Sequence, residues 1–155
     1  MKKYIGIKLI LATAISRLEY NEKRKWTVPE DENPNDEGYM VEYLDSPNAN
    51  TDFSPYYVSW SPKDVFEKAY RATDEMTFGL AIEALKMGHR VARKGWNGKG
   101  IFLELQTPTK TSKMTSPYIY IDTTGLQGDN KYAPKSLVPW LASQTDMLAE
   151  DWVII

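Results

Sequence analysis

The residues from 93 to 100 are of types that can bind a phosphate group. The last six residues of this segment include three glycines. Its basic residues are Arg93, Lys94 and Lys99. Glycines let backbone N–H groups approach an anion closely and converge on it. Trp96 adds a flat face on which a purine could stack. The alternative is a plain hairpin turn built on Asn97-Gly98, with Trp96 packed back on a sheet.

A second segment, residues 138–146, places polar side chains close to a tryptophan. Trp140 is followed by Ser143, Gln144 and Asp146. This pattern predicts a short helix that opens at Ser143, where free N–H groups and the positive end of the helix dipole favour an anion. The alternative is capping, in which Ser143 and Asp146 satisfy each other's backbone N–H groups. Taken from spacing alone, a turn and a cap are the more frequent reasons for these two patterns.

Catalytic and metal-binding patterns are weak. The sequence has no cysteine and one histidine, His89, which excludes disulfides, thiolate chemistry and a multi-histidine metal site. His89 follows a predicted helix end, where histidine is more often a favourable charge than a general base. The acidic residues 30–37 lack the alternating spacing of a calcium loop. We therefore expect no catalytic residue, no metal and no cofactor.

The hydrophobic spacing of the C-terminal half predicts the elements that position both segments. Thr77 caps a helix over 78–86, and Gly88 supplies its left-handed end. Residues 89–93 and 101–106 form a hairpin around the glycine-rich tip. Further strands are predicted at 118–122, 136–141 and 151–155. The expected fold class is α+β, a small antiparallel sheet with one main helix.

The N-terminal half is predicted to be a smaller α+β unit. A strand is expected within residues 4–10, followed by a helix over 16–25 with a capping box of Ser16 and Glu19. Strands at 39–44 and 56–60 form a hairpin. Ser61 is expected to cap a following helix, with Pro62 at its first position. The two predicted units are residues 1–75 and residues 76–155.

Length and charge limit the class of protein. A chain of 155 residues holds one ordinary domain or two very small ones, and 42% hydrophobic and 12% aromatic residues exclude disorder. The net charge of −2 provides no uniform basic surface for nucleic acid or a membrane. Residues 1–75 carry 10 Lys and Arg against 14 Asp and Glu, whereas residues 76–155 carry 9 against 7. The C-terminal half therefore suits an anion better. The apolar run 5–15 is too short and too charged to span a membrane, so we expect a cytoplasmic protein.

Three segments of the C-terminal half closely resemble the Thoeris anti-defence two family. They are Met76-Thr-Phe-Gly-Leu-Ala-Ile-Glu-Ala-Leu-Lys, Val91-Ala-Arg-Lys-Gly-Trp-Asn-Gly-Lys-Gly-Ile-Phe-Leu and Val138-Pro-Trp-Leu-Ala-Ser-Gln-Thr-Asp-Met-Leu-Ala-Glu-Asp-Trp. The resemblance covers residues 76–155. It implies a phage protein that binds and holds the NAD-derived immune signal glycocyclic ADP-ribose without cleaving it, so that the Thoeris effector is not activated. It also implies a homotetramer with ligand pockets between protomers, and some members hold cyclic dinucleotides.

The resemblance assigns a ligand-binding role to residues of both segments. The candidates are Arg93, Trp96, Asn97, Gly98, Trp140, Ser143, Gln144 and Asp146. The resemblance also implies that residues 76–155 are a ligand-binding domain and that residues 1–75 are an accessory domain of unknown role, which minimal family members lack. The alternative function is a phage interaction or structural module without a small ligand. An enzyme that degrades nucleotide signals is a third hypothesis, and His89 would be its only obvious base.

Overall fold

The computed structural model describes residues 1–155 and divides them into two compact units, Met1–Tyr70 and Arg71–Ile155. Both units combine a small antiparallel sheet with short helices, which confirms the predicted α+β class. None of the helices has the length and hydrophobicity needed to cross a bilayer.

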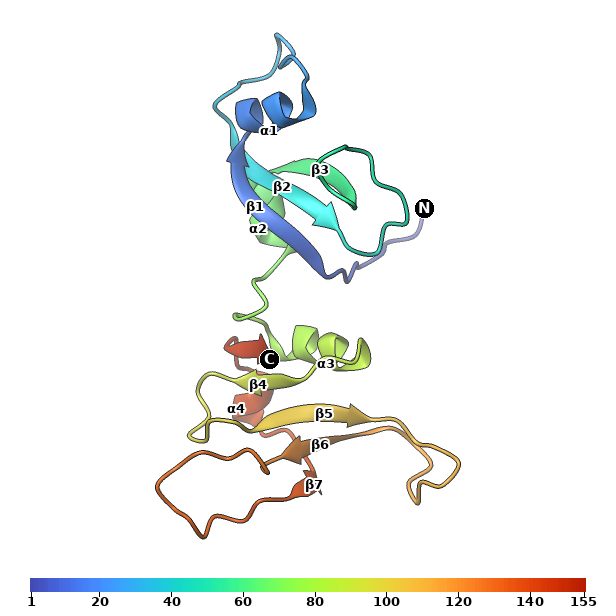
Figure 1. Cartoon of the computed structure of the whole chain (residues 1–155), viewed down its shortest axis with the longest axis vertical. Helices are drawn as coiled ribbons and strands as arrows, with labels where there is room; N and C mark the ends of the chain where they lie inside the picture. Colours follow the sequence, from blue (N-terminus) through green and yellow to red (C-terminus); the bar gives the residue numbers. More distant parts are fainter. The chain divides into compact units, whose positions relative to one another are not determined.

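The first unit is a three-stranded antiparallel sheet in the order β1-β2-β3 (Figure 1). Helix α2 lies against one face, where the rings of Tyr39 and Phe66 stack with centroids 4.1 Å apart. Val41 and Val58 are its most deeply buried side chains. The elements are β1 (Ile10–Ser16), α1 (Arg17–Arg24), β2 (Glu37–Tyr43), β3 (Tyr57–Pro62) and α2 (Lys63–Ala69).

The predicted elements of the first unit agree only in part with the structure. The capping box of α1 is present, because Ser16 and Glu19 each accept a hydrogen bond from the backbone N–H of the other. The first strand is displaced from the predicted residues 4–10, since pairing with β2 begins only at Ile10. The predicted cap of α2 was wrong. Pro62, not Ser61, is the N-cap residue, and no side chain bonds to the first turn.

The second unit is a five-stranded antiparallel sheet in the order β7-β6-β5-β4-β8. The order of the strands in the sheet differs from their order in the chain, because the last strand, β8, returns to pair with β4. Strand and helix positions agree closely with those predicted. The elements are α3 (Phe78–Lys86), β4 (Val91–Arg93), β5 (Phe102–Gln106), β6 (Tyr118–Asp122), β7 (Leu137–Pro139), α4 (Gln144–Met147) and β8 (Trp152–Ile154).

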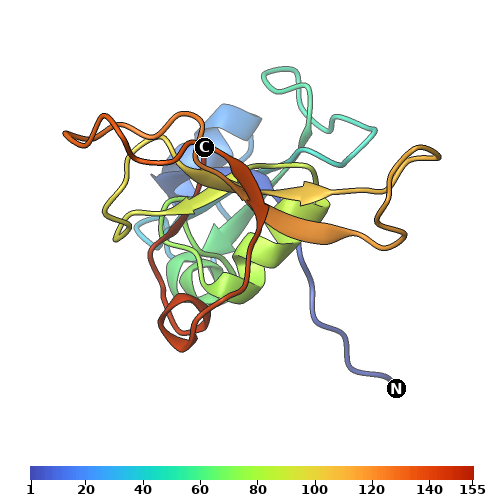
Figure 2. The same cartoon turned by 90° about the horizontal axis from the view of Figure 1, so that it is seen from below.

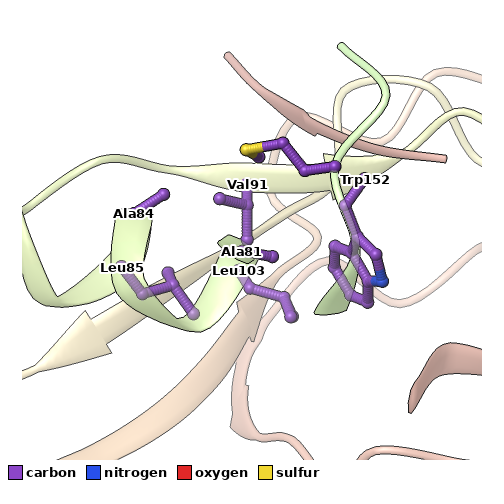
Figure 3. Packing of buried hydrophobic residues seen from close by; sticks show 7 residues of the cluster. Ala81, Ala84, Leu85, Val91, Leu103 and Trp152 are labelled. Carbon is purple, nitrogen blue, oxygen red and sulfur yellow. The ribbon is translucent and has the colours of Figure 1, made fainter. Parts of the chain in front are cut away.

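Helix α3 forms the core of the second unit with the sheet (Figure 3). Thr77 caps the helix by accepting a hydrogen bond from the Leu80 N–H, and Gly88 follows it with φ of 90°. The helix presents small side chains, which allow close approach to the strands. The fully or nearly fully buried residues are Met76, Ala81, Ala84, Leu85, Val91, Leu103 and Trp152.

Two long loops extend from opposite ends of this sheet (Figures 1 and 2). One is residues 107–117. The other, residues 123–136, lies beside the β4–β5 hairpin loop. The Gln127 N–H donates to the Lys99 carbonyl at 2.9 Å, and Gly100, with φ of 78°, packs against Gly125. Loop 123–136 therefore supports the tip of the hairpin.

Candidate functional site

The side chain of Arg93 joins the two segments singled out in the sequence. At the end of β4, its Nη1 donates to Asp146 Oδ1 at 2.9 Å and its Nε donates to Asp151 Oδ1 at 2.8 Å. Asp151 also accepts a hydrogen bond from the Gly95 N–H at 2.8 Å. Only 18% of the Arg93 side chain is exposed. We call Arg93, Asp146 and Asp151 the arginine latch.

Both carboxylates of the arginine latch are held in the ionised form. Burial alone would raise the pKa of Asp146, but hydrogen bonds from Ser143, Arg93 and Trp96 outweigh it and lower the pKa to about 2. The hydrogen bond from Arg93 is also the main reason why the pKa of Asp151 is lowered. The two carboxylates in turn raise the pKa of Arg93. The latch is thus fully ionised at neutral pH, and its two carboxylates around one guanidinium leave a net negative charge.

Three indole rings pack together beside the arginine latch. The ring centroids of Trp96 and Trp140 are 6.3 Å apart, and those of Trp96 and Trp152 are 5.5 Å apart, in edge-to-face geometry. Trp96 Nε1 donates to Asp146 Oδ1 at 3.3 Å. Trp152 is fully buried, whereas Trp96 and Trp140 are half-buried. The two outer tryptophans therefore keep accessible ring surface, with positions fixed by packing and by Asp146.

Helix α4 is a single turn, and its cap was correctly predicted. Ser143 Oγ accepts from the Asp146 N–H at 3.1 Å, and Asp146 Oδ2 accepts from the Ser143 N–H at 3.1 Å. The capping alternative is therefore confirmed for this pair. The cap uses the N–H groups of Ser143 and Asp146. Only the N–H groups of Gln144 and Thr145 are left to bind an anion at this helix end.

The other predicted residues lie at the surface around this cluster. Asn97 and Gln144 are exposed, and their amide groups make no hydrogen bond within the chain. Gly98 packs against the side chains of Leu126 and Ile101. Of the hairpin lysines, Lys94 pairs with Asp74 at 3.1 Å, whereas Lys99 is exposed and has no ion pair. Hydrogen bonds and ring contacts thus bring together five of the predicted residues, Arg93, Trp96, Trp140, Ser143 and Asp146. The other three, Asn97, Gly98 and Gln144, lie outside this cluster.

The pocket next to the arginine latch is lined by none of the eight predicted residues. Its volume is about 320 Å³, and its lining is mostly charged. It touches the latch through Asp151 and the hairpin through Lys94. The lining residues are Arg71, Asp74, Glu75, Thr77, Lys94, Glu150 and Asp151. In a single copy of the chain, the predicted residues form a surface rather than the wall of this pocket.

Sequence reasoning missed Asp151 as part of the network. Its neighbour Trp152 was expected in the core and is found there, fully buried. The signal for Asp151 is available only after the strands are paired. Arg93 lies opposite Trp152 in the β4–β8 ladder, which brings the acid beside Trp152 to the guanidinium.

Two comparisons with known proteins identify the family of the C-terminal half. The model of the Thoeris anti-defense 2-like domain matches residues 76–155, which contain the whole candidate site. The chain is also similar to Thoeris anti-defense 2 of Bacillus phage SP01, with 40% identity over 85 residues. These make up 52% of this chain and 96% of that protein. The chain therefore belongs to the Thoeris anti-defense 2-like family, and this membership supports a role in phage anti-defence.

Proposed function

We propose that the family-matched half of this chain binds glycocyclic ADP-ribose and holds it without cleaving it. Sequestration of this NAD-derived signal would keep the Thoeris effector inactive. The observation that carries the proposal is the bonding of the hairpin segment to the α4 segment through Arg93, Asp146 and Trp96. The two segments with ligand-binding chemistry thus form one surface in a member of an anti-defence family.

The half-buried tryptophans suit the adenine of such a ligand. Trp96 and Trp140 are inclined at 61° to each other, so the two rings differ in the direction of their faces. An aromatic face held by its neighbours stacks a base without an entropic cost for ordering the ring. The amides of Asn97 and Gln144 are hydrogen-bonding groups suited to ribose, whereas the Ser143 hydroxyl is bonded to Asp146 and Thr145.

The pyrophosphate is assigned to the hairpin loop rather than to Arg93. The guanidinium of Arg93 is committed to two carboxylates, so binding of a phosphate there would have to break the arginine latch. Lys99 has no ion pair, and it stands between Gly98 and Gly100. Loop N–H groups next to an unpaired lysine provide the chemistry of an anion site. Arg93 and Asp146 are then positioning residues that hold Trp96.

A binding role without turnover is consistent with the charge state of the cluster. A general acid at neutral pH needs a raised pKa, whereas Asp146 and Asp151 both have a lowered pKa. Their anionic form is already used to hold Arg93. The proposed residues therefore supply binding groups, and none of them has the perturbation expected of a general acid.

Sharing of the site between copies of the chain is part of this proposal. The predicted residues form an open surface in one copy, and a ligand with adenine, two riboses and a pyrophosphate needs more enclosure for tight binding. A homotetramer with pockets between protomers would provide it. The proposed action takes place in the cytoplasm of the host cell, on a diffusible signal.

Calorimetric titration of glycocyclic ADP-ribose into tryptophan variants tests the proposal. Stacking of a base on an aromatic ring contributes about 1–3 kcal/mol, so Trp96→Ala and Trp140→Ala should each weaken binding by about tenfold to a hundredfold. Trp26→Ala is the matched control because Trp26 is an exposed tryptophan outside the family match. It should bind as the unchanged protein does.

Folding of the variants is checked separately. Trp96→Phe keeps an aromatic ring in the cluster but loses the hydrogen bond to Asp146, so it should bind better than Trp96→Ala. Circular dichroism in the near ultraviolet reports whether the remaining tryptophans stay packed. Unchanged affinity in both alanine variants, with the fold retained, would show that the ligand does not bind at this surface.

A further inference from the structure

Strand β1 is an unprotected sheet edge. Edge strands present unpaired N–H and C=O groups, and proteins usually protect them by shortness, proline, charge or a bulge. Strands β7 and β8 have three residues each, and β3 and β7 both end in proline. Strand β1 has seven residues, Ile10–Ser16, with no proline and no charged side chain, and it pairs with β2 without a bulge. Its central residues 11–14 are all exposed.

The unit that carries this edge has a very small core. Its buried hydrophobic residues are Tyr20, Val41 and Val58, whereas the second unit buries seven. A three-stranded sheet in a unit of this size is marginal, and small domains are commonly supported by disulfides, metals or self-association. The chain has no cysteine, so disulfides are excluded. Self-association along β1 would add backbone hydrogen bonds and bury apolar surface.

We propose that β1 pairs in antiparallel fashion with β1 of a second copy of this chain, across a two-fold axis at Thr13. The sequence of the strand is self-complementary in this register. Ala12 lies opposite Ala14 of the second copy, and Leu11 lies opposite Ile15, so small residues meet small ones and branched apolar residues meet each other. A two-fold interface requires such reciprocal matching. Two three-stranded sheets then become one sheet of six strands.

Charge also favours this edge for a second copy. Residues 1–70 carry 9 Lys and Arg against 12 Asp and Glu, so most surfaces of the unit would oppose acidic groups in a symmetric dimer. Strand β1 is uncharged and is flanked by Lys8 and Arg17. The paired residues 10–16 therefore bring no charged side chain into the contact, and the flanking Lys8 and Arg17 each pair with a carboxylate of their own unit. The paired residues all lie outside the family match, so the pairing can be tested without ligand.

Single-cysteine variants of the full chain test the register directly, because the chain has no cysteine of its own. Opposed residues of antiparallel strands have Cα atoms about 4.5–5.5 Å apart, within the range for a disulfide. Thr13→Cys should therefore form a disulfide-linked dimer under mild air oxidation. Leu11→Cys is the matched control, since two copies of residue 11 would be four residues apart, or about 13 Å.

The expected result on a non-reducing gel is a dimer for Thr13→Cys, a monomer for Leu11→Cys and a dimer for Leu11→Cys combined with Ile15→Cys. Absence of the Thr13→Cys dimer, or equal dimer formation by Leu11→Cys alone, overturns the proposal. Native mass spectrometry gives a second measurement. Thr13→Lys should reduce the number of subunits, whereas Thr115→Lys, at an exposed loop residue, should not. An unchanged mass for a folded Thr13→Lys variant also overturns it.

Discussion

Arg93, a candidate ligand-binding residue, is already bonded to two carboxylates within the chain. The sequence offers it as a cation for a phosphate, but the structure uses it to join Asp146 and Asp151 across more than 50 residues of chain. A partly buried guanidinium with two carboxylate partners is costly to separate from them. The contribution to binding that we propose for it is therefore indirect, through the position of Trp96.

Asp146→Asn should destabilise the protein by about 1–2 kcal/mol at pH 7 and by much less near pH 2. The folded-state pKa of Asp146, about 2, is below its usual value of 3.8. Its ionised form therefore stabilises the fold above about pH 4, and this stabilisation is lost as the pH falls toward 2. Urea unfolding at a series of pH values measures the difference between variant and unchanged protein.

Asp129→Asn is the control for this series, because Asp129 is an exposed residue of loop 123–136 without an ion pair. It should change the free energy of unfolding by less than about 0.5 kcal/mol at any pH. An effect of Asp146→Asn that is the same at pH 7 and at pH 2 would contradict the assigned ionisation.

The cap of α4 could be predicted from the sequence, whereas the contacts of the arginine latch could not. Ser143 and Asp146 interact over three residues, so their spacing alone predicts the bond. The approach of Asp151 to Arg93 depends on the pairing of β4 with β8, which no local pattern specifies. The same holds for the packing of Trp96 against Trp140. The residues of the candidate site were thus foreseeable by type, and their bonding partners were not.

At the scale of elements, the hairpin loop depends on the close approach of two glycines. Gly100 has φ of 78°, and a Cβ there would collide with the Gly125 carbonyl oxygen. Gly100→Ala should therefore destabilise the protein by about 2 kcal/mol or more, through backbone strain and the collision. It should also weaken ligand binding, because the loop that carries Gly98 and Lys99 would be displaced.

Gly79→Ala is the matched substitution in a helix. Gly79 lies in the first turn of α3, and the nearest atom to an added Cβ is 3.9 Å away. Alanine should stabilise the helix there by about 0.5–1 kcal/mol. Thermal unfolding compares the two variants, and a stable Gly100→Ala protein with unchanged affinity would refute the role given to the loop.

Elements with strong local signals were predicted almost to the residue. Helix α3 has a cap at Thr77, apolar positions at helical spacing and a glycine after its end, and it begins and ends where expected. Strand β1 shows the limit of such reasoning. Residues 4–16 are apolar and strand-prone nearly throughout, so composition cannot say which of them pair. The paired residues are set by the length and position of β2, which extends from Glu37 to Tyr43 and pairs with seven residues from Ile10 onward.

At the scale of the whole molecule, the chain consists of two units of unlike charge and different core size. The second unit contains the family match, the larger core and every residue of the candidate site. The match to the phage SP01 relative takes up 96% of that protein and 52% of this chain, about the length of this unit. The proposed anti-defence chemistry therefore belongs to the second unit, and the first is an addition for which we propose self-association through β1.

The most direct test of the proposed sequestration is the recovery of intact ligand from the full chain. Purified protein is incubated with glycocyclic ADP-ribose, freed of unbound ligand by filtration, and then denatured by heat, and the released material is identified by mass spectrometry. Sequestration predicts stoichiometric retention and release of unchanged glycocyclic ADP-ribose. Release of a cleaved product would show an enzyme, and absence of retained ligand would show that the chain does not sequester this signal.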